Sequence, residues 1–493
     1  MNYISTRGGG SRRASAYAIK TGLAEDGGLY MPEYIPTLTL EELSLFVRES
    51  YTIRAARILS KFLTDYTFNE LLEDAEKAYS FDKFGASPAP LSSLGDLGYM
   101  LELWHGPTAA FKDMALQIMP RLFVRSLKKC GENDTALILV ATSGDTGKAA
   151  LEGYRDIKGT KIKVFYPIDG VSRVQKLQMQ TQEGENVSVS GIVGNFDDAQ
   201  TGVKRIFSDK KIQEELKSVG VFLSSANSIN WGRLVPQIVY YVSAYCDLVA
   251  NGKIDLGDAI DISVPTGNFG NIFACYIAKK MGLPVGKLIC ASNKNDVLTE
   301  FLSTGRYNRN REFHTTVSPS MDILISSNLE RLLYITLGAE KTRGYMEQLN
   351  KNGEYTLTSG DFEIIRAEFS GYSTSEEETA NTIKSIYNEK NCLIDTHTAV
   401  AICATKRYIN DNKAERTVLT VSTASPYKFA KDVYYSLTNE KTDDLEALSA
   451  LCQLTGVPIP EPLSDIGKRR VLHTDIIAKD DMEAAVLAFA GEN

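Results

Sequence analysis

The sequence predicts an α/β protein whose parallel sheets carry helices on both faces. Beyond residue 90, short apolar runs alternate with amphipathic stretches. The run "TALILVA" (135–141) leads through a turn into a helical pattern, and "KIKVFYP" (161–167) and "DISVP" (261–265) are followed in the same way. Such alternation is typical of βαβ units, in which ligands bind beyond the carboxyl ends of the strands.

Domain organisation follows from length and periodicity. The 493 residues exceed what one hydrophobic core ordinarily covers, so two or three domains are expected. Apolar positions spaced by three and four between Leu38 and Tyr79 predict a helical N-terminal domain, assigned to residues 1–90. A Pro/Gly/Ser-rich stretch at 85–101 is expected to be a connector. Two α/β domains then cover 91–255 and 256–493, and the charged segment after Ser436 is expected to form a helical cap.

Composition limits the class of function. The net charge of −8 argues against a nucleic-acid partner, because binding phosphates requires a basic surface. The seven cysteines are odd in number and never spaced as C-x-x-C, which indicates cytosolic core thiols rather than disulfides or a zinc site. The N-terminus lacks the apolar run of a signal peptide, and no stretch approaches the roughly 20 apolar residues of a membrane span. We therefore expect a cytoplasmic protein, monomeric or homodimeric, without membrane contact.

Lys112 lies in "LWHGPTAAFKDMALQ" (103–117), among Phe111, Met114 and Leu116 and just after a Gly-Pro loop. An ammonium group is costly to bury. A lysine placed among apolar side chains therefore either extends its head to water or has a chemical task.

Two turns between a buried strand and a helix are suited to anions. The turn "TGNFGN" (266–271) follows "DISVP", and "ATSGDTGKAA" (141–150) overlaps the end of the strand at 135–141. A glycine-rich turn at a helix N-terminus offers free backbone N–H groups and the positive end of the helix dipole. Each turn alone is equally compatible with plain turn or capping geometry. The second is not a nucleotide-binding P-loop, which needs glycine at 142 and Ser or Thr at 149, where Thr142 and Ala149 stand.

Polar side chains gather at two further places. In "LTVSTASPYKFA" (419–430) an apolar strand ends in the hydroxyls of Ser422, Thr423 and Ser425. In "SSANSINWGRLVPQ" (224–237) a group suited to an oxyanion precedes a helical pattern: Asn227, Ser228, Asn230 and Arg233. Plain turn chemistry before a proline is favoured for any one of these hydroxyls taken alone, and a polar helix N-terminus explains the second cluster about equally well.

The four histidines show no metal-ligand spacing, so no metal site is expected. They are His105, His314, His397 and His473, each interpreted as a surface or satisfied core residue. His105 is kept as a candidate because it lies just upstream of Lys112. Taken together, the lysine, the two turns and the alcohol cluster match what pyridoxal phosphate requires. The lysine forms the Schiff base, one turn binds the cofactor phosphate, the other the substrate carboxylate, and one side chain meets the pyridine nitrogen.

The chain also resembles the threonine synthase family, in its long bacterial and fungal branch. The resemblance rests on "LAEDGGLYMP", "ELWHGPTAAFKDMALQ", "ATSGDTG", "SSANSIN", "PTGNFGN" and "STASPYKF", spread in family order over nearly the whole chain. It implies a fold type II pyridoxal-phosphate enzyme, similar to tryptophan synthase beta, with pyridoxal 5'-phosphate between two α/β domains. It also implies conversion of O-phospho-L-homoserine and water into L-threonine and phosphate, the last step of threonine biosynthesis.

The same resemblance implies roles by position. Lys112 corresponds to the Schiff-base lysine and proton shuttle, and Thr423 to the partner of the pyridine nitrogen. The cofactor phosphate is assigned to Gly267, Asn268, Phe269, Gly270 and Asn271. The substrate carboxylate is assigned to Ser143, Gly144, Asp145 and Thr146, and the substrate phosphate to Asn227, Ser228, Asn230 and Arg233.

One position departs from the family. Ser425 stands where the family commonly has the histidine of Ser-Thr-Ala-His-Pro, so acid–base work at 425 is not expected, whereas Thr423 is unaffected. Two other functions stay open. One is a phospho-lyase of the same fold, acting on O-phosphohomoserine or O-phosphothreonine to give 2-oxobutyrate. The other is a catalytically silent ligand sensor, which would have no reason to keep Lys112 in this setting.

Overall fold

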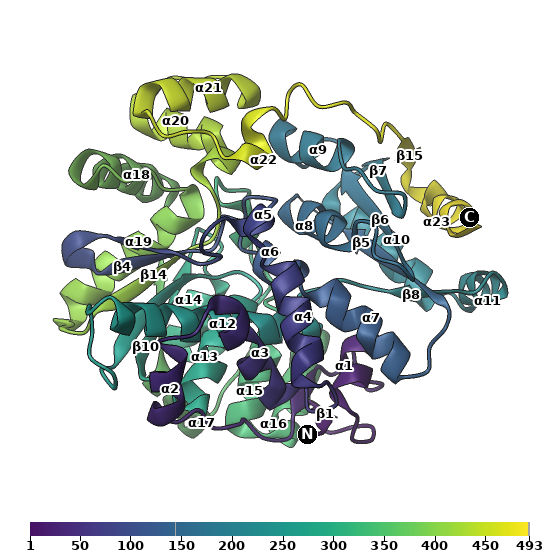
Figure 1. Ribbon diagram of the computed structural model, residues 1–493, viewed down its shortest axis with the longest axis horizontal. Helices are drawn as coiled ribbons and strands as arrows, with labels where there is room; N and C mark the ends of the chain where they lie inside the picture. The colour runs from purple at the N-terminus through teal and green to yellow at the C-terminus, as the bar shows by residue number, and fades with distance from the viewer. Residues whose placement is uncertain (143, 492–493) are drawn as a thin grey trace.

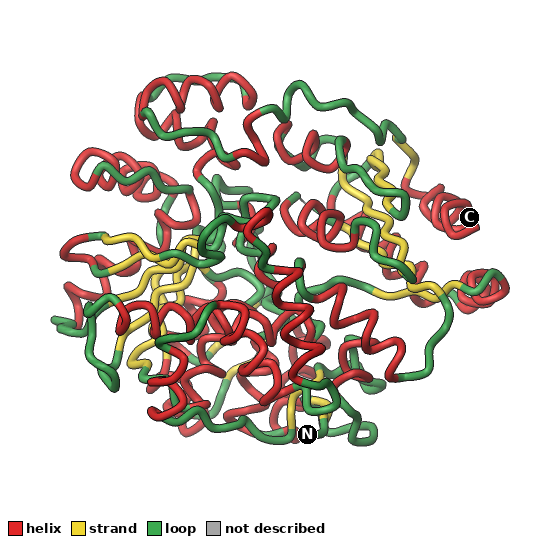
Figure 2. The backbone as a smooth tube through the Cα atoms, viewed as in Figure 1, coloured by secondary structure: helices red, strands yellow, loops and turns green. Residues whose placement is uncertain are grey.

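Two β-sheets, each flanked by helices, organise the chain, as the alternating pattern predicts (Figure 1). The computed structural model describes residues 1–142 and 144–491. The larger sheet has the strand order β13-β10-β9-β14-β4-β3, and the smaller has the order β15-β7-β6-β5-β8. Figure 2 shows the strands gathered in two separate groups with helices around each.

The larger sheet is parallel except at one edge, where β3 runs antiparallel to β4. Its strands are β3 (Leu91–Ser93), β4 (Tyr99–Glu102), β9 (Ile260–Pro265), β10 (Val285–Ser292), β13 (Phe369–Ser373) and β14 (Val418–Ser422). The smaller sheet is wholly parallel. Its strands are β5 (Thr135–Ala141), β6 (Thr160–Pro167), β7 (Val187–Val193), β8 (Val221–Ser224) and β15 (Ile476–Ala478). Two antiparallel pairs lie apart: β1 (Tyr3–Ser5) with β2 (Tyr30–Pro32), and β11 (Arg306–Asn308) with β12 (Glu354–Thr356).

The sheets divide the chain differently from the expected boundaries at 90/91 and 255/256. Strands β3 and β4 join the larger sheet, although the residues expected to share their domain form the smaller one. Most of the stretch 85–101 is therefore a hairpin of the larger sheet, formed by β3 and β4, rather than a connector. One of its glycines is required by close packing: Gly98 has a φ of +91°, and a Cβ there would lie 2.1 Å from the carbonyl oxygen of Val418 in β14. Strand β15, from the far end of the chain, completes the smaller sheet beside β7.

The N-terminal region, for which a helical domain is expected, is mostly helical. It contains α1 (Ser15–Thr21), α2 (Leu40–Phe46), α3 (Tyr51–Phe62), α4 (Phe68–Ala78) and α5 (Phe81–Phe84). Thr39 and Thr67 begin α2 and α4 with reciprocal side-chain caps to Glu42 and Glu70, which satisfy the first free N–H groups. The apolar face of α3 packs against α12, so this region is joined to the central core of the molecule.

The remaining helices cover the two sheets. Around the smaller sheet and its approaches lie α6 (Asp113–Leu116), α7 (Met119–Lys129), α8 (Asp145–Tyr154), α9 (Arg173–Gln180), α10 (Phe196–Ser208), α11 (Lys210–Ser218) and α23 (Met482–Gly491). The others are α12 (Trp231–Ala250), α13 (Gly270–Met281), α14 (Val297–Thr304), α15 (Leu329–Leu337), α16 (Ala339–Asn352), α17 (Ser359–Glu368), α18 (Glu376–Lys390), α19 (Thr396–Asn412), α20 (Ala430–Thr438), α21 (Asp444–Thr455) and α22 (Glu461–Ser464). Four 3₁₀ turns are η1 (Gly95–Leu97), η2 (Pro319–Met321), η3 (Pro426–Phe429) and η4 (Lys479–Asp481). Helix α21 lies in the charged segment after Ser436, where a helical cap is expected.

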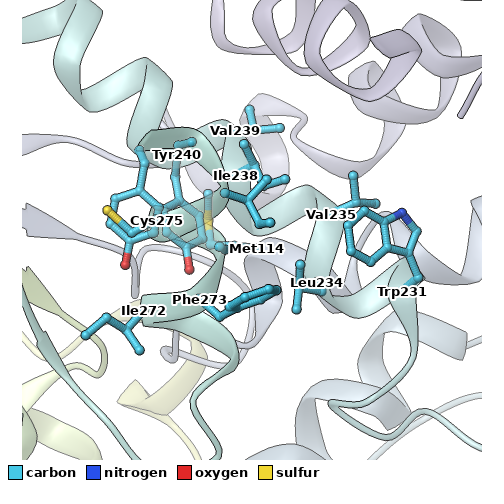
Figure 3. Close-up of a cluster of buried hydrophobic side chains, with 14 of the residues drawn as sticks. Met114, Trp231, Leu234, Val235, Ile238, Val239, Tyr240, Ile272, Phe273 and Cys275 are labelled. Atoms are coloured by element: carbon cyan, nitrogen blue, oxygen red, sulfur yellow. The ribbon is translucent and has the colours of Figure 1, made fainter. Parts of the chain in front are cut away.

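The central core forms where α12 packs against α13, α3 and α6. Figure 3 shows side chains of α12 and α13 gathered with Met114 of α6 in one buried cluster. A helix that is apolar on most of its faces must be enclosed, and the residues of α12 are buried along almost its whole length. Within the described ranges, no helix is both long and apolar enough to cross a membrane. The short helix α6, next to Lys112, thus packs against this core.

Candidate active site

Lys112 stands at the N-cap of α6, at the end of a loop joined to β14. Leu103 N donates to the carbonyl of Ser422, and Phe111 N donates to the carbonyl of Thr423 at 2.8 Å. The Lys112 side chain is only 11% exposed. Burial lowers the pKa of its ammonium group, which is the condition an amine needs to act as a nucleophile or base near neutral pH. Of the two interpretations of this lysine, the structure therefore favours a chemical task.

The turn before Lys112 is closed by its neighbour. The carboxylate of Asp113 accepts hydrogen bonds from the backbone N–H of Thr108 at 2.8 Å and from its hydroxyl at 2.7 Å. Burial raises the pKa of Asp113 to about 6, although both hydrogen bonds act in the opposite direction. Because Asp113 is fully buried, these contacts fix the backbone that presents Lys112.

Two polar groups from distant parts of the chain contact the Lys112 amine, and a third contacts one of these two. The Lys112 Nζ lies 3.3 Å from Ser320 Oγ and 3.7 Å from Asp145 Oδ2. The other oxygen of Asp145 lies 2.9 Å from Lys428 Nζ. Ser320 belongs to η2, Asp145 begins α8 of the smaller sheet, and Lys428 lies in η3 after β14. The site therefore lies between the two sheets, beyond the carboxyl ends of β5 and β14.

The turn 143–146, which was expected to bind the substrate carboxylate, has a carboxylate of its own at its centre. Ser143 lies outside the described residues. The Asp145 side chain is negatively charged and already contacts Lys428, Lys112 and Gln175, so it cannot itself bind a carboxylate. The role remains possible only for backbone N–H groups at the start of α8, near Gly144 and Thr146. Gly144 has a φ of +143°, a conformation that side chains rarely adopt.

The 266–271 turn fits a phosphate group. Phe269 adopts the left-handed conformation, with φ of 60°, at the N-cap of α13. The carbonyl of Asn268 accepts hydrogen bonds from the backbone and side-chain amides of Asn328 at 3.0 and 2.9 Å, which secures the turn from behind. A Cβ at Gly267 would lie 2.7 Å from the carbonyl oxygen of Ser320, so glycine is required there. Gly270 then begins α13.

Asn271 leaves one donor free at this turn. Its Oδ1 accepts hydrogen bonds from the hydroxyls of Tyr240 at 2.6 Å and Tyr241 at 2.5 Å. Its Nδ2 is buried and has no hydrogen-bond partner among the described residues. A buried donor without a partner is costly, so it indicates a missing acceptor such as a phosphate oxygen. The residues present therefore fit the phosphate of pyridoxal phosphate.

Thr423 and Ser425 follow β14 beside the lysine loop. Thr423 is buried, and its carbonyl is the acceptor for Phe111 N, so it adjoins Lys112 as the resemblance requires. Ser425 is fully buried, and its hydroxyl accepts from Tyr427 N at 3.3 Å as the N-cap of η3. Its backbone N–H donates to Ala109 at 3.0 Å. Ser425 thus has a structural task, and no acid–base function is needed to explain it.

The four residues assigned to the substrate phosphate are not brought together. Both polar atoms of the buried Asn230 side chain are used, Oδ1 by Gly232 N and Nδ2 by Ile19 O, both at 2.8 Å. Asn227 is exposed and lines a separate cavity of about 320 Å³ beside α10, and Ser228 is half-buried. Arg233 alone remains: it is buried, donates from Nη1 to Ala226 O at 2.6 Å, and its Nε lacks a partner among the described residues. Burial lowers the pKa of Arg233 to about 10.

Sequence reasoning missed three site residues, namely Ser320, Lys428 and His397. His397 is buried, and its ring accepts a hydrogen bond from Ser320 N, whereas the candidate His105 is partly exposed, stacks on Trp104 and contacts Glu102. Lys428 donates to Asp145 Oδ1, and also to Thr108 O and Gln178 Oε1 at 3.0 Å each. The signal for Lys428 was its place inside "STASPYKF", five residues after Thr423.

Comparison with known proteins gives one family along most of the chain. Residues 2–79 match the family described as "Threonine synthase N terminus", 87–424 match "Pyridoxal-phosphate dependent enzyme", and 398–472 match "Threonine synthase, C-terminal". The threonine synthase of Pseudomonas aeruginosa is 40% identical over 439 residues, which is 88% of this chain and 90% of that protein. That of Saccharomyces cerevisiae is 38% identical over 469 residues, 88% of this chain and 89% of that protein.

Solved structures show the same similarity in three dimensions. A crystal structure of threonine synthase from Brucella melitensis with bound PLP superposes with a TM-score of 0.88 at 35% identity, covering 100% of both chains. The yeast threonine synthase structure also gives 0.88, at 33% identity and 99% coverage of both chains. The fold type II architecture expected from the sequence is thereby confirmed.

Proposed function

The chain belongs to the threonine synthase family of pyridoxal-phosphate-dependent enzymes, and from this membership we propose that it converts O-phospho-L-homoserine and water into L-threonine and inorganic phosphate. The observation that supports this proposal most is the position of Lys112. A buried amine of lowered pKa lies between the two sheets, next to Thr423, and the charge of the buried Arg233 contributes to lowering that pKa. A ligand sensor would not need such an amine.

The residues present divide naturally among the parts of the cofactor. We assign the covalent link to Lys112, the cofactor phosphate to the 266–271 turn with Asn271 Nδ2, and the pyridine nitrogen to Thr423. When bound, pyridoxal phosphate supplies an electron sink that makes the Cα and Cβ protons of the substrate removable. A neutral alcohol at Thr423, in place of a carboxylate, would leave the pyridine nitrogen unprotonated and moderate that sink.

Lys112 moves the protons in this proposal. As a neutral amine it takes the Cα proton, gives that proton up, and is then able to take a Cβ proton, so that the γ-phosphate leaves with the electrons of its C–O bond. A proton returned to Cγ forms the methyl group. After the hydroxyl of water adds at Cβ, Lys112 returns a proton to Cα. Burial favours the neutral amine, and the nearby carboxylate of Asp145 stabilises the ammonium once the proton has been taken.

Arg233 is the residue that we assign to the substrate phosphate. Its unpaired Nε and its positive charge suit a dianion, and its burial strengthens the attraction because water is excluded. The position of the attacking water then decides the product. If water is not placed to add at Cβ, the same intermediates give 2-oxobutyrate and ammonia instead of threonine.

Two measurements test the proposal. Purified protein given O-phosphohomoserine should release threonine and phosphate in equal amounts, and 2-oxobutyrate as the main product would favour the lyase instead. Borohydride reduction followed by peptide mapping should place the pyridoxyl label on Lys112. A label on another lysine, or binding of the substrate without turnover, would contradict the assignment.

We also propose a cytoplasmic enzyme, monomeric or homodimeric, and sedimentation equilibrium distinguishes the two assemblies.

A further inference from the structure

A buried group of charges links the two sheets at the site. It consists of Lys112, Asp145 and Lys428, and the charge of Arg233 also acts on Lys112. Asp145 is the central member: one oxygen lies 3.7 Å from Lys112 Nζ and the other 2.9 Å from Lys428 Nζ. The side chains of Asp145 and Lys428 are 3% and 0% exposed, so solvent screens their interaction little.

Lys428 has no donor left for a ligand. An ammonium group has three N–H bonds, and three acceptors lie within 3.0 Å of Nζ: Asp145 Oδ1, Thr108 O and Gln178 Oε1. Two of these acceptors come from helices of the smaller sheet, α8 and α9, whereas Thr108 lies in the loop that presents Lys112. Lys428 therefore fixes the position of Asp145 relative to the lysine loop.

Asp145 is oriented from other directions as well. Gln175 donates to the same oxygen that contacts Lys428, at 2.9 Å. Ser320 Oγ lies 3.4 Å from the oxygen that faces Lys112. With these partners the carboxylate cannot rotate freely, so Oδ2 stays directed at the Lys112 amine.

We propose that Asp145 is the counter-ion of the Lys112 ammonium, and that Lys428 is the positioning residue that holds this carboxylate and weakens its attraction for Lys112. The inference rests on the proposed function, because it concerns the proton that Lys112 takes and returns. A single carboxylate beside a buried amine would keep the ammonium form too stable to release its proton. A second ammonium group sharing the carboxylate makes both forms of Lys112 accessible.

The other charged groups near Lys112 fit this arrangement. Burial is the largest influence on the pKa of Lys112 and lowers it; Asp145 raises it, and Lys428 and Arg233 lower it further. Asp113, next in the chain, has both carboxylate oxygens hydrogen-bonded to Thr108. Asp145 is thus the carboxylate in direct contact with the amine among the described residues.

The test measures the ionisation of Lys112 in the full-length protein after the cofactor is removed with hydroxylamine. Trace labelling with acetic anhydride over a pH series, followed by mass spectrometry of the Lys112 peptide, gives the fraction of neutral amine. An opposite charge within about 4–6 Å shifts a pKa by about one unit or more, and one unit is tenfold in labelling below the pKa. We expect Asp145→Asn to label Lys112 about tenfold faster than the unmodified sequence. Lys428→Met should label it more slowly, because Asp145 then has Lys112 as its principal cation.

The two substitutions are expected to change the labelling rate of Lys112 in opposite directions. If Asp145 and Lys428 had only a structural role, the two rates would not change in opposite directions. Lys148→Met is the matched control: Lys148 is another buried lysine, on α8, but it pairs with Glu152 at 3.1 Å, so labelling of Lys112 should stay within twofold. The double variant Asp145→Asn with Lys428→Met removes both charges while keeping similar shapes, and it is measured if either single variant fails to fold. Lys112 should be labelled faster in it than in the unmodified sequence, because Asp145 influences the pKa of Lys112 more than Lys428 does.

The proposal would be overturned if the two single variants changed the labelling rate of Lys112 in the same direction, or if neither changed it. A pyridoxyl label on a different lysine would refute the proposed role of Lys112 without altering these labelling rates, so the two failures are distinguishable.

Discussion

The Nε2 atom of His397 accepts a hydrogen bond from the backbone N–H of Ser320, at a donor–acceptor distance of 3.2 Å. On its other side the ring lies 2.8 Å from the carboxylate of Asp395, which accepts from Nδ1–H. This pairing assigns His397 the neutral tautomer, with no free position for acid–base work. The histidine instead anchors the loop that carries Ser320 to the Lys112 amine.

Replacing His397 by alanine should therefore impair catalysis, because the loop that carries Ser320 would be displaced from the Lys112 amine. The Ser320 N–H would lose its acceptor, at a cost of about 1–3 kcal/mol in the free energy of unfolding. A displaced loop should lower kcat/KM for O-phosphohomoserine about 10- to 100-fold. His105→Ala is the control, because that ring is partly exposed and contacts Glu102, and it should change kcat/KM less than twofold. Equal losses in both variants would argue against the anchoring role.

The Asp145–Lys428 pair should make stability depend on pH in a defined window. Burial alone would raise the pKa of Asp145, but Lys428 and Lys112 outweigh it and lower that pKa well below its usual range. The unfolded chain then binds the proton more readily than the folded one. The contribution is complete above the unfolded pKa of about 3.9 and is lost as the pH falls further.

Urea unfolding at several pH values checks this expectation. Asp145→Asn should lower the free energy of unfolding by about 3 kcal/mol at pH 7, because it leaves a buried ammonium without its counter-ion. The difference from the unmodified sequence should narrow below about pH 4. Glu25→Gln, at an exposed ion pair with Arg13, should change the free energy of unfolding far less, because solvent screens exposed charges. A difference that grows as the pH falls would contradict the assigned sign.

Gly267→Ala should disturb the cofactor turn and the Ser320 loop together. The added Cβ would lie 2.7 Å from a backbone oxygen, so one of the two segments must move. We expect at least about a tenfold loss of pyridoxal-phosphate affinity, measured by equilibrium dialysis, together with a lower Tm. Gly360→Ala within α17 has nothing within 4 Å of its Cβ and should leave affinity unchanged and stability equal or higher. Full affinity in the Gly267 variant would show that the phosphate binds elsewhere.

Arg233→Ala should affect the substrate far more than the cofactor. Loss of a buried charged donor to a phosphate should lower kcat/KM for O-phosphohomoserine at least about 100-fold, while the absorption spectrum of the bound cofactor stays the same. Arg233→Lys should recover part of the loss, since it restores the charge but not the planar donor. Arg366→Ala, at an exposed pair with Glu363, serves as control. Unaltered kinetics in the Arg233 variant would remove the assignment.

Local patterns in the sequence were sufficient for the elements but not for the contacts between them. The strand, turn and helix over 135–154 and again over 260–281 follow from apolar runs and glycines that act within a few residues. The hairpin at 91–102 was interpreted as a connector because Gly98 serves a contact with Val418, far along the chain. Periodicity carries no information on such a partner.

The site shows the same division. Lys112, Asn271 and Arg233 were predicted because each lies in a recognisable motif, although the consequence of burial for each had to come from the fold. The Lys112–Ser320 contact joins residues 208 positions apart, and the Ser320–Asp145 contact joins residues 175 apart. Asn230 illustrates the reverse error: a polar residue ahead of a helix was assigned to the substrate, but it caps the helix.

The edge strand of the smaller sheet, β15, has a consequence for how the protein is made. It spans Ile476–Ala478, whereas its neighbour β7 spans Val187–Val193. Because synthesis proceeds from the N-terminus, β5 to β8 leave the ribosome long before their last partner exists. Pairing over such a separation is also slow, since a long loop must close first. During that interval β7 presents an uncovered edge, which is a template for pairing with other chains. The smaller sheet is therefore open to aggregation during synthesis until β15 pairs with β7.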